Sequence, residues 1–272
     1  VDKTQDPISS GGGAWNQFIK KNPDFSFSKF YDWSIENYFK EGMHVVEIGA
    51  FQGKSTCYLA QGIKKKFGPN IKLDVVDTWY GSKEPHMRKY NDNWLYDTFN
   101  KNMMDAGVSD IVNPVRGDSH QVHNQYEDNS LDWIFLDAGH TFEDVYFDLM
   151  GWWPKLKVGG VIAGDDYIGK EGWNLRFSCV EAEGWGEMSS KFPFLKHMVK
   201  HAVDLFVLKN LGDGKYNDSD TGTVLELSYS MHNNFRNNWL AHNKLKKFKR
   251  SSIDGGNRTW IIKKTEDLWK GW

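Results

Sequence analysis

Cysteine is scarce in this chain, and neither a long apolar run nor a strong charge of either sign is present. The two cysteines, Cys57 and Cys179, lie far apart and form no CxxC pair, which argues against a disulfide framework and a cysteine zinc site. No apolar run approaches the roughly 20 residues that cross a bilayer, and no signal-peptide pattern opens the sequence. A net charge of −2 gives no general electrostatic reason to bind nucleic acid. We therefore expect a cytoplasmic protein without a membrane or nucleic-acid partner.

Aromatic residues, by contrast, are abundant. They make up 15% of the 272 positions and include 13 tryptophans, whereas the hydrophobic (39%) and charged (26%) fractions are those of an ordinary globular protein. Packing in a core is the simpler explanation, and aromatic walls around a sugar or another planar substrate are the alternative. Residues 1–24 contain a Ser-Gly-rich stretch and are expected to be a flexible lead-in that precedes the folded domain.

Between residues 25 and 167, short apolar runs alternate with segments of helical periodicity. Continuous apolar runs suit strands that are covered on both faces, and strands that alternate with helices favour a mainly parallel sheet. The sequence therefore predicts a doubly wound α/β fold. Strands are expected at 43–48, 71–77, 110–118, 131–138 and 158–167, and helices at 25–39, 53–68, 88–106, 119–126 and 142–156.

The C-terminal part departs from this alternation. Residues 168–194 and 211–256 are expected to be insertions that cover a substrate, separated by a helix at about 194–208. Strand-like segments near 223–229 and 257–264 bring the expected sheet to seven strands. Residues 25–272 are thus predicted to form one domain with C-terminal insertions.

Two glycines mark the turn that follows the first expected strand. In VVEIGAFQGKST, Gly49 and Gly53 stand where a strand must turn into a helix, and glycine allows both the turn and the close approach of a ligand. The spacing is neither the GxGxxG of dinucleotide-binding proteins nor that of a phosphate-binding P-loop.

Here the chain resembles the class I S-adenosylmethionine-dependent methyltransferases, which have a Rossmann-like fold. Glu47 and Gly49 match the acidic-x-Gly motif of that family, and Asp77 matches the acidic residue that accepts hydrogen bonds from both ribose hydroxyls. Asp118 stands where a residue meets the adenine. A strand-end aspartate that only caps a helix or forms a turn is the alternative reading of each residue. The resemblance implies a cofactor site made of Glu47, Gly49, Gly53, Ser55, Asp77, Thr78, Asp118 and Ser119.

A second resemblance covers roughly residues 25–167 and rests on FLDAGHTFEDVYFDLMGWWPKLKVGGVIAGDDY. This segment looks like the small-molecule O-methyltransferases, which include macrolide-sugar and catechol-type enzymes. In metal-dependent members, the residues matching Asp137, Asp165 and Asp166 bind a divalent cation. Clustered carboxylates repel one another unless a cation neutralises them, and oxygen ligands favour Mg²⁺. The alternative is that Asp165 or Asp166 caps the next segment or contacts the cofactor, since many relatives need no metal.

His140 matches the position of a catalytic lysine in the catechol-type enzymes. An imidazole can take a hydroxyl proton near neutral pH, so His140 is a candidate catalytic base. A histidine that only bonds to backbone is the alternative, and Asp137 is a candidate base if no metal binds it. His120 and His123 are expected to contact solvent or the rim of the cofactor site, and the basic run 244–250 is expected to be a solvated helix face.

Together these features predict methyl transfer from S-adenosylmethionine, assisted by Mg²⁺, to a hydroxyl of a small molecule or a carbohydrate. Trp152, Trp153, Trp173 and Trp185 are candidates for acceptor contact, although the first two are expected to pack in the core. An RNA or protein methyltransferase and a non-catalytic cofactor-binding module are the alternatives. The sequence is compatible with a homo-oligomer and does not identify the acceptor.

Overall fold

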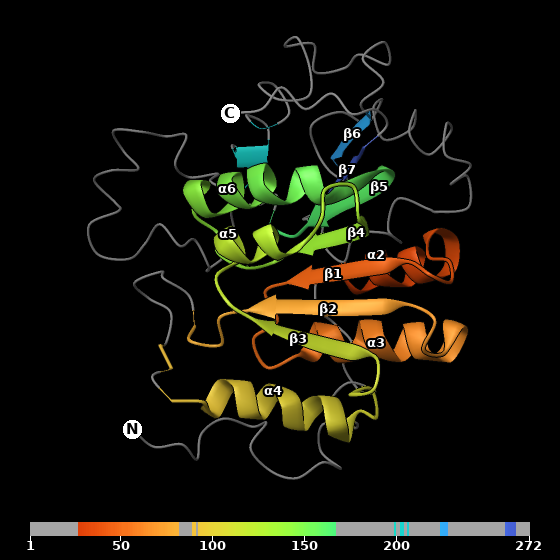
Figure 1. The fold of residues 1–272 in the computed structure, drawn as a ribbon, viewed down its shortest axis with the longest axis vertical. Coiled ribbons are helices and arrows are strands. Elements are labelled where there is room, and N and C mark those ends of the chain that lie inside the picture. Colours follow the sequence, from red (N-terminus) through yellow and green to blue (C-terminus); the bar gives the residue numbers. More distant parts are fainter. Residues whose placement is uncertain are drawn as a thin grey trace, which may run out of the picture.

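A seven-stranded sheet forms the centre of the computed structural model of the chain (Figure 1). The structure describes residues 27–81, 89–90, 92–166, 199, 202–203, 206, 224–227 and 259–264. The order across the sheet is β3-β2-β1-β4-β5-β7-β6, which confirms the predicted doubly wound fold. The strands are β1 (His44–Ile48), β2 (Lys72–Asp77), β3 (Val112–Arg116), β4 (Leu131–Leu136), β5 (Leu156–Gly164), β6 (Val224–Leu227) and β7 (Trp260–Lys263).

The first five strands pair in parallel, whereas β7 runs antiparallel to both β5 and β6. Their order reverses direction between β1 and β4, because the chain moves first toward β3 and then returns to the other side of β1. In open α/β sheets, ligands bind outside the carboxyl ends of the strands at such a reversal. The arrowheads of β1 and β2 in Figure 1 mark this edge.

Most of the predicted helices are present, with shifted ends. The segment predicted at 25–39 is an α-helix that continues as a π-helix, and the short helix after β3 ends in a 3-10 turn. The helix predicted to begin at Arg88 begins at Trp94 instead, after Asn93 as its N-cap residue. The bounds are α2 (Ser28–Trp33), η2 (Ser34–Tyr38), α3 (Lys54–Phe67), α4 (Trp94–Asp105), α5 (Ser119–Val122), η3 (His123–Gln125), α6 (Phe142–Trp152) and η4 (Trp153–Lys155).

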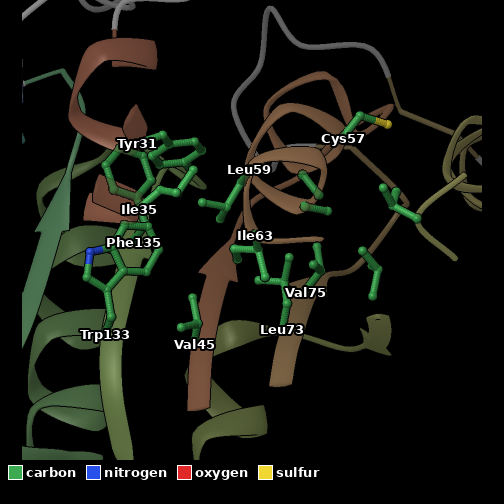
Figure 2. Packing of buried hydrophobic residues seen from close by; sticks show 14 of the residues in the cluster. Tyr31, Ile35, Val45, Cys57, Leu59, Ile63, Leu73, Val75, Trp133 and Phe135 are labelled. Carbon is green, nitrogen blue, oxygen red and sulfur yellow. The ribbon is translucent and has the colours of Figure 1, made fainter. Parts of the chain in front are cut away.

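Two hydrophobic clusters cover the two faces of the sheet, because successive side chains of a strand point to opposite faces. On one face, α2, α3 and α4 pack on β1, β2 and β4, and the rings of Tyr31, Trp133 and Phe135 lie against one another (Figure 2). On the other face, α6 and η4 pack on β4, β5 and β7. Trp152 and Trp153 are buried in this second cluster, which confirms that both belong to the core.

Several predicted features lie outside the described residues. They are the lead-in 1–24, the insertion 168–194 with Trp173 and Trp185, the insertion 211–256 apart from β6, and the basic run 244–250. Of the helix predicted at 194–208, the described positions Val199, Ala202, Val203 and Phe206 are helical and buried. Among the described helices, none combines the length and the apolar character that a membrane crossing requires.

Candidate functional site

The strand ends that carry the predicted site residues are joined to one another by backbone hydrogen bonds. The amide of Gly49 after β1 donates to Val76 of β2, and the amide of Gly117 after β3 donates to Asp77. Beyond β4 and β5, the amide of Asp137 donates to Ile48 and that of Asp165 donates to Leu136. The residues that follow the five parallel strands therefore lie at one edge of the sheet.

Gly49 and Gly53 allow the tight turn between β1 and α3, which is residues 49–53 and forms the glycine loop. Both have a φ of +86°, in the left-handed region that favours glycine. A Cβ atom on Gly49 would lie 2.0 Å from the carbonyl oxygen of Asp137, and one on Gly53 would lie 2.8 Å from the Phe99 ring and 2.3 Å from the end of the Met103 side chain. Glycine is therefore required at both positions, by the backbone angle and by the neighbouring atoms.

Asp77 closes this loop from the end of β2. Its Oδ2 atom accepts hydrogen bonds from the amides of Ala50 and Phe51 at 2.8 and 2.9 Å, and its Oδ1 atom accepts one from the amide of Trp79 at 2.7 Å. A carboxylate offers about four lone-pair sites, so these bonds leave about one for a ligand. The predicted pair of hydrogen bonds from the two ribose hydroxyls would need two acceptor sites. The three amide donors leave Asp77 about one site, which suffices for one hydroxyl.

Glu47 lies beneath the loop and has an exposed fraction of 1%. Its carboxylate accepts hydrogen bonds from Tyr31, at 2.8 Å, and from Thr56, and it is also bonded to the Ser55 side chain. Burial raises the pKa of Glu47 to about 7, although these hydrogen bonds act in the opposite direction. Glu47 and Ser55 therefore support the loop from within the fold.

Asp118 begins α5 at the end of β3. Its carboxylate accepts a hydrogen bond of 3.1 Å from the amide of His120 and so caps the helix. Beyond that bond, Ser119 is hydrogen-bonded to the buried Asp148 of α6. Thr78, across from β3, accepts a bond from Arg116 through its carbonyl oxygen. The predicted adenine residues thus stand on a short helix that is fixed at both its cap and its first turn.

Asp137, His140 and Asp166 form a compact group, the acidic cluster, after β4 and β5. The Nε2 atom of His140 lies 3.0 Å from Oδ2 of Asp166 and 3.6 Å from Oδ1 of Asp137. One potential ligand atom from each residue lies within 4.8 Å of the other two. The three side chains are 21% to 30% exposed, so a ligand can reach them and the cluster can hold a cation or a proton.

The third predicted metal ligand, Asp165, is not a member of this group, and His140 stands in its place. Asp165 continues the ladder of β5 through its bond to Leu136 and is 6% exposed. Asp166, by contrast, has a φ of +58°, so the chain leaves the strand at this residue. Neighbouring residues of a strand end face different ways, and a pair of adjacent aspartates is therefore divided between a buried and an accessible position.

Two side chains of the site were not anticipated from the sequence. Phe51 is 48% exposed on the glycine loop, with a φ of +50°, and Asp148 is buried behind α5. The signal for Asp148 was available, because an aspartate stands among the apolar residues FEDVYFDLMGWW that face the core. No pattern in the sequence marked Phe51 as accessible.

Comparison with known proteins assigns this architecture. The model of a family described as a methyltransferase domain matches residues 46–167, from β1 to the residue after the acidic cluster. Residues 46–167 are an S-adenosylmethionine-dependent methyltransferase domain. The match begins one residue before Glu47 and ends one residue after Asp166. It therefore includes the glycine loop and the acidic cluster of the methyltransferase.

Solved structures support the fold of the methyltransferase. The chain is similar to the O-methyltransferase NovP, with 16% identity, a TM-score of 0.50 and coverage of 88% of this chain and 78% of that one. Cofactor-bound Rv0187 from MTB has 16% identity, a TM-score of 0.51 and coverage of 97% and 93%. A Staphylococcus aureus protein proposed to be a caffeoyl-CoA O-methyltransferase has 13% identity, a TM-score of 0.53 and coverage of 94% and 93%. Identities this low establish a shared fold.

Proposed function

We propose that the methyltransferase moves the methyl group of S-adenosylmethionine to a hydroxyl of a small molecule, and that this acceptor is a sugar. The observation that supports this most is the packing of Gly49 on the backbone of Asp137. It makes the glycine loop and the acidic cluster immediate neighbours, so a donor on the loop adjoins an acceptor at the cluster. Methyl transfer requires such proximity, because the acceptor oxygen must approach the sulfonium methyl in line.

In this proposal the nucleoside half of the cofactor lies along the ends of β2 and β3. Asp77 accepts one ribose hydroxyl with its remaining lone pair, and Asp118 and Ser119 meet the adenine. The methionine half lies at the glycine loop, where backbone groups are accessible because the glycines carry no side chain. Of the remaining proposed cofactor residues, Glu47, Gly49, Gly53 and Ser55 form or support that loop, whereas Thr78 follows Asp77 at the end of β2.

His140 is the proposed catalytic base. The sulfonium makes the methyl group reactive, so the protein has to orient the acceptor and remove its proton. His140 suits this role because Asp137 and Asp166, at 3.6 and 3.0 Å, stabilise the imidazolium that forms when the ring takes the proton. The two carboxylates also fix the orientation of the ring. Asp137 is the alternative base.

A divalent cation fits the same cluster. Asp137 and Asp166 would hold it, with His140 or the adjacent Asp165 as the third ligand. An imidazole bound to the cation cannot take the acceptor proton, so His140 acts as the base only where Asp165 is the third ligand. Bound there, Mg²⁺ would make the acceptor hydroxyl more acidic and orient its oxygen. The imidazole in this ligand set also suits Mn²⁺ or Zn²⁺, so several cations are to be compared.

The choice of a sugar rests on the resemblance to sugar O-methyltransferases and on exposed aromatic rings. Phe51 and Tyr80 are 48% and 54% exposed, and both lie on loops that Asp77 holds or adjoins. Such rings offer flat apolar faces against which the carbon face of a sugar or another small ring can pack. A net charge of −2 gives less support to an RNA acceptor.

Calorimetry with S-adenosylmethionine tests the cofactor half of the proposal. We expect binding in the micromolar range by the intact chain, and no binding at millimolar cofactor would contradict the proposal. The Asp137→Ala and His140→Ala variants should keep this affinity within about threefold. Titration of Mg²⁺ and Mn²⁺ into the protein, read by calorimetry and by the electron paramagnetic resonance of Mn²⁺, tests the metal independently of turnover. Asp137→Ala should remove the cation signal.

Methyl transfer to a panel of sugars and catechols, with labelled cofactor, tests the catalytic half. We expect transfer to fall by about a hundredfold or more in His140→Ala, since a positioned base contributes 10²–10⁴-fold. Asp97→Asn removes an exposed carboxylate on α4 and serves as the matched control. Transfer that is unchanged in both His140→Ala and Asp137→Ala would refute the assigned centre, and labelling of RNA but of no small molecule would refute the acceptor class.

A further inference from the structure

Asp148 is a buried carboxylate that the proposed chemistry does not use. It lies on α6 with an exposed fraction of 2%. The hydroxyl of Ser119 donates a hydrogen bond to it, and its Oδ1 atom lies 3.7 Å from Nε2 of His120. Among the described residues this Oδ1 atom has no hydrogen-bond partner. Burying a carboxylate costs free energy unless neighbouring donors offset the loss of water.

A second contact ties the same two helices together. Nε2 of His120 lies 3.0 Å from the carbonyl oxygen of Asp144 on α6, and the His120 ring meets the edge of the Phe147 ring at 5.9 Å between centroids. His120 also donates its backbone amide to the carboxylate of Asp118. The first turn of α5 is therefore held from behind by α6, through both Ser119 and His120.

We propose that Asp148 is a positioning residue for the adenosine half of the cofactor. By accepting a hydrogen bond from Ser119, it fixes the turn that presents Asp118 to the adenine. The inference rests on the proposed function, which assigns Asp118 and Ser119 to that base. Because α6 begins directly after the His140 loop, with Thr141 as its N-cap residue, the same helix links the adenine turn to the acidic cluster.

A dependence on pH follows from the charge of Asp148. Burial raises its pKa to about 7, whereas the hydrogen bond from Ser119 and the nearby His120 act in the opposite direction. The other charged groups that face it are Asp144 on α6 and Asp118 at the start of α5, and both raise the pKa. Above pH 7 the ionised carboxylate accepts the bond from Ser119. Below pH 7 it takes up a proton, and the bond from Ser119 loses the strength that the negative charge gives it.

Calorimetry with adenosine tests this inference, because adenosine lacks the methionine half and does not change its charge between pH 5.5 and 8.5. We expect the Kd of the wild-type chain to rise about fivefold between pH 8 and pH 6. Asp148→Asn should bind adenosine about tenfold more weakly at pH 8 and show a flat profile. Asp97→Asn, the exposed control, should match the wild type. An Asp148→Asn variant with wild-type affinity and a wild-type pH profile would overturn the inference.

Two further measurements keep the outcome clear. Thermal unfolding establishes that Asp148→Asn is folded, and if it is not, His120→Gln replaces it. That variant leaves the carboxylate in place and removes the imidazole that lowers the pKa of Asp148, so the midpoint of the adenosine profile should move to higher pH. An unmoved midpoint would count against the inference. Failure of the wild-type chain to bind S-adenosylmethionine at any pH would instead refute the proposed function.

Discussion

The hydroxyl of Tyr31 donates a hydrogen bond of 2.8 Å to the carboxylate of Glu47, and both side chains are buried. Tyr31 lies on α2, ahead of the sheet in the chain, and Glu47 lies in β1 directly before Ile48 and Gly49. This hydrogen bond connects α2 to β1, the strand that leads into the glycine loop. The loop therefore depends on a residue outside the span that the family model matches.

Removal of that hydroxyl should destabilise the fold in a pH-dependent way. Tyr31→Phe leaves the buried Glu47 with one donor fewer, which costs about 1–3 kcal/mol when the carboxylate is ionised. We expect the full loss of unfolding free energy at pH 8 and a smaller loss at pH 5, where Glu47 is protonated. Urea unfolding at both values measures it. Tyr58→Phe, which removes a surface bond to Asp32, should change stability by less than about 0.5 kcal/mol.

Glu47 itself should lower stability as the pH rises. Its pKa is about 7 in the folded chain and 4.5 as the ordinary value, so the folded state binds more protons between these limits. The free energy of unfolding therefore falls across this range, by up to about 3 kcal/mol from this group. Glu47→Gln does not titrate, and its stability should fall less between pH 4.5 and pH 7 than that of the wild type. Parallel profiles of the two proteins would contradict the assignment.

Asp74 should have the opposite effect. Burial raises its pKa, but hydrogen bonds from His44 and Asn113 outweigh burial and hold it at about 2. A carboxylate with a lowered pKa stabilises the fold above its ordinary value of 3.8 and loses this contribution as the pH falls toward 2. Asp74→Asn should therefore lose on the order of 1–2 kcal/mol at pH 7.

Urea unfolding at pH 7 measures this loss, and acid unfolding followed by circular dichroism measures the window. The wild type should lose the contribution of Asp74 only below about pH 4. Asp110→Asn breaks an exposed ion pair with Lys64 and should have little effect at pH 7, since solvent screens an exposed pair and its net contribution to stability is small. Equal losses in the two variants would show that the buried network of Asp74 has no special weight.

A pair of glycine variants separates backbone strain from steric contact. Gly49 and Gly68 both have a positive φ, but a Cβ atom on Gly68 would meet nothing within 4 Å. Gly68 has a φ of 62° and a ψ of −136°, so Gly68→Ala should lose only the strain of this backbone conformation, about 1–3 kcal/mol. Gly49→Ala should lose more, because the new atom would collide with the backbone of Asp137, and it should also abolish cofactor binding. Thermal unfolding and calorimetry distinguish the two, and equal behaviour would contradict the assigned packing.

Much of this arrangement was accessible from the sequence because it depends on local patterns. The apolar runs that end in Gly49, Asp77 and Asp137 correctly located the parallel strands, and parallel strands bring their carboxyl ends to one edge. The start of α4 was placed too early because the run Asn91-Asp92-Asn93, which favours turns and helix N-caps, was not read as a boundary. The observed helix begins only after the N-cap Asn93.

Contacts between distant elements were harder to predict. The replacement of Asp165 by His140 in the compact cluster depends on the backbone angle at Asp166, which no spacing in the sequence specifies. The hydrogen bonds from three backbone amides to Asp77 were not predicted for a related reason. The sequence shows a strand-end carboxylate but not how closely the loop after β1 folds back on it.

The three hydrogen bonds from backbone amides to Asp77 affect how the cofactor binds. Because Asp77 already secures the turn after β1 from within the protein, the arriving nucleoside meets a surface that has its final shape. Little conformational freedom is then surrendered on association. We therefore expect capture of the cofactor to proceed in a single kinetic phase, set by the rate of encounter and not by a rearrangement of this turn.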